Sequence, residues 1–117
     1  MANLLGDRLI LGAIQSLSSG MIDYLQDTNT YTKKDVEECT NIVYTFLGAA
    51  EFAMDKGEFL KTVEISVKKL NRLNEKCQYQ LIETDQREEI AGIMIRAGFL
   101  KGFNGEDEDV TEEWREW

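Results

Sequence analysis

The chain has 117 residues, of which 43% are hydrophobic, and this share is typical of a chain that folds rather than a disordered one. Its length suits a single domain, residues 1–117, with one modest core. The formal net charge of −9 and the pI of about 4.5 argue against nucleic-acid binding, which normally needs a basic surface, and they leave open the binding of a basic protein partner.

The first helix is predicted over residues 3–25, where apolar side chains share one broad face. Ser18–Gly20 are poor helix formers, so a kink or a break is expected there. Asp7 and Arg8 interrupt the apolar run, and no positively charged segment precedes it. The start of the chain therefore favours neither a signal peptide nor a membrane span, and we expect a cytoplasmic protein without membrane contact.

The second helix is predicted over residues 33–55. Thr32 precedes it and Asp35 follows three residues later, which is the spacing of a capping box. Gly57 lies where a left-handed glycine would end the helix, and the small residues 48–50 predict the close approach of another helix. The apolar positions step by three and four residues and share one face: Val36, Cys39, Val43, Phe46, Ala50 and Ala53.

The third helix is predicted over residues 58–79, and the short link before it makes it an antiparallel neighbour of the second. We expect Val43 and Phe46 to be buried against Val67 and Leu70 across this pair. The apolar face of the third helix comprises Phe59, Val63, Val67, Leu70, Leu73 and Cys77. Its other side carries what we call the basic ridge: Lys68, Arg72 and Lys76, with Lys61 and Lys69 beside them.

Cys39 and Cys77 both fall on apolar helix faces. We predict that both thiols are reduced and inert, because free cysteine is among the most buried residue types. A disulfide between the two helices is the alternative. The chain has no histidine and no CxxC motif, so the sequence does not favour a metal site.

The fourth helix is predicted over residues 86–100, with Asp85 and Glu88 as its starting signature. Its inward side chains are Ile90, Ile93, Met94, Ala97 and Leu100. The predicted fold is thus all-α, an antiparallel bundle of about four helices followed by a short helical turn or tail, residues 102–117.

This C-terminal tail, residues 102–117, holds seven acidic residues and one basic residue, and so carries −6 of the net charge. Its two tryptophans either close over the end of the bundle or form an exposed anchor for a partner. We predict an intramolecular clasp in which the tail acids face the basic ridge and the rings supply most of the stability. The candidate partner-binding residues are Glu106, Asp107, Glu108, Asp109, Glu112, Glu113, Trp114 and Trp117.

The residue inventory argues against catalysis. Without histidine there is no His-based triad, and no P-loop or GxGxxG motif is present, so no cofactor is predicted. Adjacent carboxylates such as Glu37/Glu38, Glu88/Glu89 and Glu112/Glu113 point about 100° apart on a helix, so the two members of a pair are poorly placed to share a catalytic site. We interpret them as parts of solvent-exposed helix faces. The acidic run 106–109 lacks the glycine of a calcium-binding EF-hand loop.

The segments LIETDQREEI (81–90) and DVTEEWREW (109–117) together resemble the end of small uncharacterised bacterial cytosolic proteins, some of which are similar to immunity proteins of polymorphic toxin systems. This resemblance implies an inhibitor that neutralises a basic toxin. The leading prediction is therefore a non-enzymatic acidic interaction protein, in its most specific form an immunity-like inhibitor. The alternatives are a structural or homo-oligomeric helical protein, such as a homodimer, and, more remotely, an enzyme with a carboxylate-based site.

Overall fold

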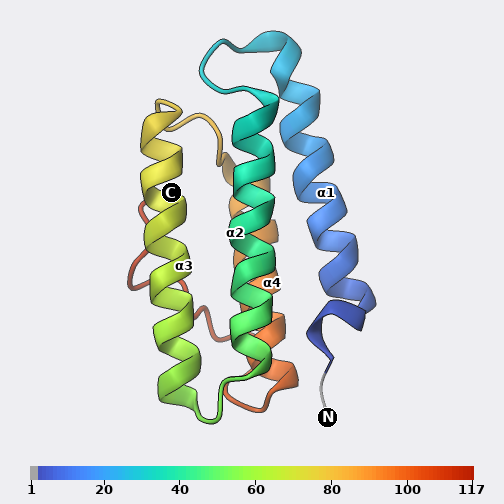
Figure 1. Cartoon of the computed structure of the whole chain (residues 1–117), viewed down its shortest axis with the longest axis vertical. Helices are drawn as coiled ribbons and strands as arrows, with labels where there is room; N and C mark the ends of the chain where they lie inside the picture. The colour runs from blue at the N-terminus through green and yellow to red at the C-terminus, as the bar shows by residue number, and fades with distance from the viewer. Residues whose placement is uncertain (1–2) are drawn as a thin grey trace.

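The computed structural model describes residues 3–117, which form four helices and no strand. The helices are α1 (Arg8–Tyr24), α2 (Lys33–Glu51), α3 (Lys56–Lys76) and α4 (Thr84–Leu100), and single 3₁₀ turns at Leu4–Gly6 and Leu25–Asp27 flank α1. They run alternately up and down as an antiparallel bundle with extents of 41 × 26 × 22 Å (Figure 1). The predicted all-α four-helix fold is confirmed.

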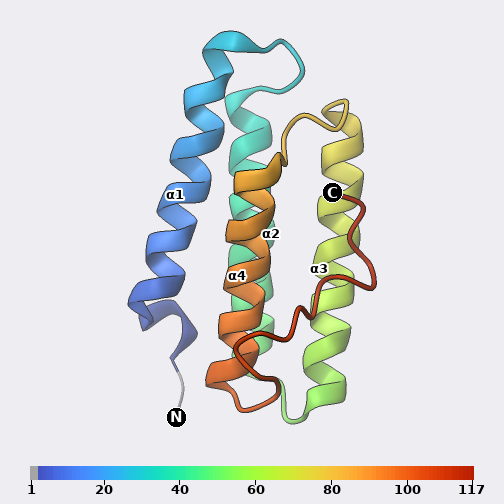
Figure 2. The ribbon, with the colours of Figure 1, turned by 180° about the vertical axis from the view of Figure 1, so that it is seen from behind.

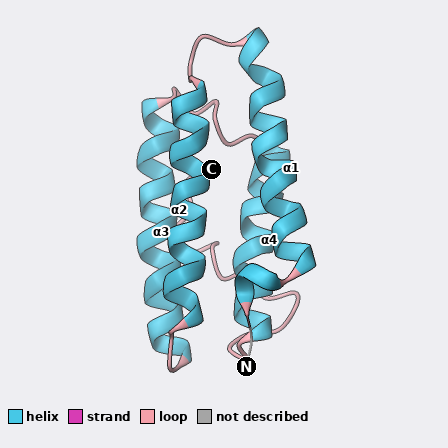
Figure 3. Cartoon of the chain, turned by 45° about the vertical axis from the view of Figure 1, so that its right-hand side comes forward, coloured by secondary structure: helices cyan, strands magenta, loops and turns pink. Residues whose placement is uncertain are grey.

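The four helices are arranged as two close pairs. Helix α1 packs along α4, and α2 packs along α3, as Figure 3 shows. Helix α1 also packs against α2. Helices α3 and α4 do not pack closely, and the C-terminal tail crosses from α4 to α3 on that side (Figure 2).

The apolar face predicted for α2 is buried in the core. Val43, Phe46, Val67 and Leu70 have no exposed surface, as the sequence predicts. The ring of Phe46 meets the ring of Phe59 from α3 edge-on, with the centroids 6.0 Å apart. The α2–α3 pair is therefore held by interlocking apolar side chains.

The start of α2 is confirmed, but its end lies earlier than predicted. The Asp35 carboxylate accepts the backbone N–H of Thr32 at 2.9 Å, as in a capping box. The helix ends at Glu51 and not at residue 55, and Gly57 is not its left-handed cap. Gly57 lies instead in the first turn of α3, because the carboxylate of Asp55 accepts the N–H of Glu58 at 2.8 Å and starts that helix early.

The link from α3 to α4 also differs from the prediction. Helix α3 ends at Lys76 rather than at residue 79, and Gln78 and Tyr79 follow with positive φ angles of 57° and 60°. Helix α4 begins at Thr84, with Glu83 and Gln86 in the capping positions assigned to Asp85 and Glu88. The Glu83 N–H donates to the Gln86 side chain at 3.1 Å, and Gln86 is buried, so tertiary packing selects this cap.

Helix α1 continues through Ser18–Gly20 without the break that these residues allow. It begins at Arg8 and not at residue 3 as predicted, because the carboxylate of Asp7 accepts the N–H of Ile10 at 3.1 Å and caps the helix there. Packing along α4 then supports the poor helix formers, since the Gln86 amide lies directly over Gly20. Tertiary contacts here outweigh the low local helix propensity.

Of residues 48–50, where a close approach was expected, Ala50 is buried in the core, but Gly48 and Ala49 are not. A Cβ atom added to Gly48 would meet nothing within 4 Å, and Ala49 is exposed. A Cβ added to Gly98 of α4 would lie 2.7 Å from the Phe59 ring and would overlap the Asn104 side chain. At Gly98, the Phe59 ring of α3 and the Asn104 side chain of the tail therefore lie against the α4 backbone.

Gly98→Ala should therefore destabilise the protein by about 1–3 kcal/mol, the usual range for overpacking a core. Gly48→Ala is the matched control, because it adds the same methyl group to a helix with open space around it. The control should stabilise the protein by up to about 1 kcal/mol through helix propensity alone. Urea unfolding followed by circular dichroism measures both. Equal free energies of unfolding for the two variants would contradict the packing described at Gly98.

Candidate functional site

The C-terminal tail lies docked on α3, as the predicted clasp requires (Figure 2). The Asn71 side-chain amide donates to the carbonyl oxygen of Trp114 at 2.8 Å, and its oxygen accepts the N–H of Glu116 at 3.0 Å. Val110 and Thr111 are buried, and the rings of Trp114 and Trp117 are partly buried against the core. The tryptophans are thus built into the fold of this chain.

The basic ridge is not the surface that holds the tail acids. Lys76 pairs with Asp35 of α2 at 3.1 Å, and Lys68 pairs with Glu64 of its own helix. Within residues 3–117, no ion pair joins a tail acid to the ridge. The prediction that the tail acids face the ridge is therefore wrong: the tail is attached to α3 by its apolar side chains, by Asn71 and by the ion pair of Glu108 with Lys56.

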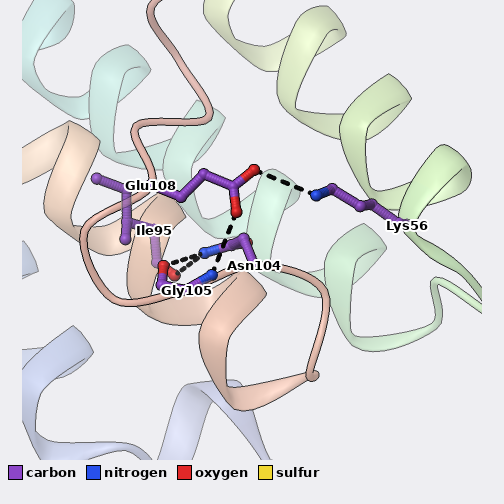
Figure 4. A network of polar contacts seen from close by, with 5 residues as sticks. All are labelled: Lys56, Ile95, Asn104, Gly105 and Glu108. Carbon is purple, nitrogen blue, oxygen red and sulfur yellow. Dashed lines mark hydrogen bonds and ion pairs between the residues drawn. The ribbon is translucent and has the colours of Figure 1, made fainter.

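A network of polar contacts fixes the start of the tail (Figure 4). The Asn104 side-chain amide donates to the carbonyl oxygens of Ile95 and Gly105, at 3.1 and 2.9 Å. The Glu108 carboxylate accepts the Gly105 N–H at 3.3 Å and pairs with Lys56 of α3 at 3.1 Å. The hydrogen bond from Lys56 lowers the pKa of Glu108. This network bends the chain away from α4 and towards α3.

Asp109 stabilises the next turn of the tail. Its carboxylate accepts the backbone N–H and the hydroxyl of Thr111, at 2.9 and 2.6 Å, and pairs with Arg115 at 3.2 Å. Burial acts to raise the pKa of Asp109, but these hydrogen bonds and the charge of Arg115 outweigh it and lower the pKa. Asp109 and Glu108 are therefore structural, although the sequence placed them with the binding residues.

In the described part of the chain, four of the predicted binding acids form no ion pair of the kind that Glu108 and Asp109 form. Glu106, Asp107, Glu112 and Glu113 are exposed, and within residues 3–117 none of them forms an ion pair. We call these four side chains the outward acids. The eight predicted site residues therefore divide into three groups: two part-buried rings, two structural acids and four outward acids.

Sequence reasoning missed a groove of about 340 Å³ between α1 and α4. Its apolar lining includes Leu9 and Phe99, which are 65% and 36% exposed. Its acidic lining comprises Glu88, Glu89 and the outward acid Glu106. The sequence held one signal of this groove, because the apolar face predicted over residues 3–25 is broad and includes Leu9, which stays exposed in the structure.

Glu89 is the unusual side chain of this groove. Its Oε2 atom is buried and has no hydrogen-bond partner. Burial, with a smaller contribution from the charge of Asp85, raises the pKa of Glu89. A buried carboxylate oxygen without a partner is costly, and within residues 3–117 no basic side chain forms an ion pair with Glu89.

The guanidinium of Arg96, which also lines the groove, is already engaged. Its Nε and Nη2 atoms donate to the two carboxylate oxygens of Asp7, at 3.2 and 3.0 Å. This hydrogen bonding lowers the pKa of Asp7 and raises that of Arg96. The guanidinium also lies over the Phe99 ring, 5.9 Å from its centroid. Within residues 3–117, Arg96 therefore forms no ion pair with the groove carboxylates of α4, Glu88 and Glu89.

Both cysteines are free thiols and are buried in the core. Burial raises the pKa of Cys39 to about 12 and that of Cys77 to about 11. Because the thiolate is the reactive form, neither residue has the environment of a reactive cysteine.

We therefore expect a thiol-reactive dye to label the native protein slowly at neutral pH, at a rate set by unfolding. The same dye should label both thiols at once in urea, which serves as the control. Rapid labelling of either thiol in the native protein would contradict their burial.

Within residues 3–117, no group of three or more cysteine, aspartate and glutamate side chains is placed to hold a metal ion. No helix in the described part of the chain has the length and apolar character needed to cross a membrane. Comparison of the chain with protein-family models, with curated proteins and with solved structures found no match.

Proposed function

We propose that the protein is a non-enzymatic interaction protein that binds a basic partner protein through the acidic surface of its C-terminal tail. The observation that carries this proposal is the state of the outward acids, which stay exposed and unpaired after the tail has docked. Four unpaired carboxylates on a docked segment place negative charge along the surface of the tail. Such charge speeds association with a basic surface and discriminates against acidic ones.

The tail suits this role because its contacts with α3 fix its position. Asn71 and the two tryptophans attach the tail to α3. The backbone that carries the outward acids is therefore already ordered, which reduces the entropy cost of binding a partner. The resemblance of segments 81–90 and 109–117 to immunity-like proteins favours a toxin as the basic partner. In that form of the proposal, the protein is a cytoplasmic inhibitor of the toxin.

The test is affinity capture from the source cell with two variants of equal charge. The tail variant carries Glu106→Gln, Asp107→Asn, Glu112→Gln and Glu113→Gln. The control variant neutralises four exposed acids outside the tail: Asp23→Asn, Asp27→Asn, Glu37→Gln and Glu75→Gln. The wild type and the control should retain a basic protein at low salt and lose it at high salt. The tail variant should not retain it. Equal loss in both variants would show that only net charge matters.

A second candidate function, self-association, is favoured by the link between α2 and α3. Phe52 and Met54 are 82% and 84% exposed there, although both are large and apolar. Exposed apolar side chains of this kind mark interfaces when they lie together. Light scattering of the purified protein tests this candidate: a dimer that Phe52→Ser with Met54→Ser converts to a monomer would support it, and a monomeric wild type would exclude it.

A further inference from the structure

We propose that the groove between α1 and α4 receives a basic amphipathic helix of the partner protein, with its apolar side chains on Leu9 and Phe99 and a lysine or arginine at Glu89. This inference rests on the proposed function and extends it, because it names the partner's chemistry and a second place of contact. The groove adjoins the tail surface, since the outward acid Glu106 lines it.

The groove exposes two large apolar side chains that a partner could cover. Leu9 is the most exposed large apolar residue of α1, at 65%, and Phe99 of α4 is 36% exposed on the same groove. The tail turns away towards α3 and leaves this side of the α1–α4 pair uncovered (Figure 2). An apolar ligand side chain seated between Leu9 and Phe99 would remove both from water.

The groove also contains three carboxylates that form no ion pair among residues 3–117. Glu88, Glu89 and Glu106 line the groove, and none forms an ion pair within the described part of the chain. These carboxylates give the groove a negative charge that favours an incoming ammonium or guanidinium, and the Oε2 atom of Glu89 is buried and lacks any hydrogen bond within residues 3–117. Arg96, the cation that lines the groove, forms its ion pair with Asp7, although the charge of Glu106 also acts on it and raises its pKa.

The shape of the groove favours a helix as the occupant. Its lining on α4 extends from Glu88 to Phe99, which corresponds to roughly 16 Å, or three helical turns, along the axis. It lies between two antiparallel helices, so a third helix can pack its side chains into the groove that they form. A helix also brings apolar and cationic side chains to adjoining faces, which matches the mixed lining.

The test measures fluorescence anisotropy of synthetic peptides of about four helical turns added to the full chain. The first peptide carries leucine on one helical face and lysine on the other. Two matched peptides replace lysine by glutamate and leucine by serine. The leucine–lysine peptide should bind, and both matched peptides should bind at least about tenfold more weakly.

Variants of the protein then locate the peptide. Leu9→Ser and Glu89→Gln should each weaken the binding of the leucine–lysine peptide by about tenfold, whereas Glu37→Gln, an exposed acid on α2, should leave it unchanged. Circular dichroism confirms that the variants are folded. Equal binding of the leucine–glutamate peptide, or normal binding by both groove variants, would overturn the inference.

The same measurements separate this inference from the proposed function. If the two groove variants bind the peptide normally while the variant that neutralises the outward acids loses it, the groove is not the site and the acidic tail surface is. If the tail variant also retains the basic protein in the capture experiment, the proposed function itself fails.

Discussion

Phe46→Ala should lower the free energy of unfolding by about 3–5 kcal/mol, the usual cost of truncating a core phenylalanine. Phe46 has no exposed surface and meets the ring of Phe59 edge-on. The ring of Phe59 in turn lies 5.6 Å from that of Phe103, at the start of the tail. These three rings connect α2, α3 and the tail, so a cavity at Phe46 would loosen all three.

Urea unfolding measures this loss, and Phe52→Ala supplies its matched control. Phe52 lies six residues further along the chain but is 82% exposed, so the same truncation there should change stability by no more than about 0.5 kcal/mol. A loss below about 1 kcal/mol for Phe46→Ala would mean that the buried face of α2 is assigned incorrectly.

Deleting residues 110–117 should also destabilise the protein by several kcal/mol. The deletion removes the buried Val110 and Thr111 and the partly buried rings of Trp114 and Trp117. A fully buried tryptophan covers about 150–250 Å², at roughly 25 cal/mol per Å² of apolar surface. Each kcal/mol lost should lower the melting temperature by about 4–8 °C. Calorimetry measures that shift, and increased ANS fluorescence should report the uncovered core.

A point substitution tests the same docking without removing the tail. Asn71→Ala loses both hydrogen bonds to the tail and should cost about 1–3 kcal/mol. Asn41→Ala is the matched control, because Asn41 is exposed on α2 and the change in helix propensity is the same. A truncated chain and an Asn71→Ala variant that both melt like the wild type would show that the tail contributes no stability.

The helical fold could be read from the sequence because its signals are local. The three-and-four spacing from Val36 to Ala50 specifies one buried helix face, and Thr32 with Asp35 specifies its start. The end of this helix could not be read in the same way. Asp55 and Gly57 both resemble terminating signals, and the cap that Asp55 provides for α3 decides between them.

The candidate site was predicted only in part because its remaining determinants are non-local. Two tryptophans within a short acidic segment predicted a docked tail correctly. The surface to which it docks depends on Asn71, which lies 43 and 45 residues before its two partners in the tail. The groove is lined by Leu9 of α1 and Glu89 of α4, which are 80 residues apart in the sequence. No local spacing predicts that two such distant residues line the same groove.

The central claim is that the tail is a docked surface which buries its rings and presents its acids. Trp114 and Trp117 are the two tryptophans of the chain, so tryptophan fluorescence reports on the tail alone. Quenching by acrylamide tests the claim most directly, because a neutral quencher is not repelled by the acidic surface as iodide would be. We predict emission at shorter wavelength and much weaker quenching in the native protein than in urea. Equal quenching in the two states would contradict the docked tail.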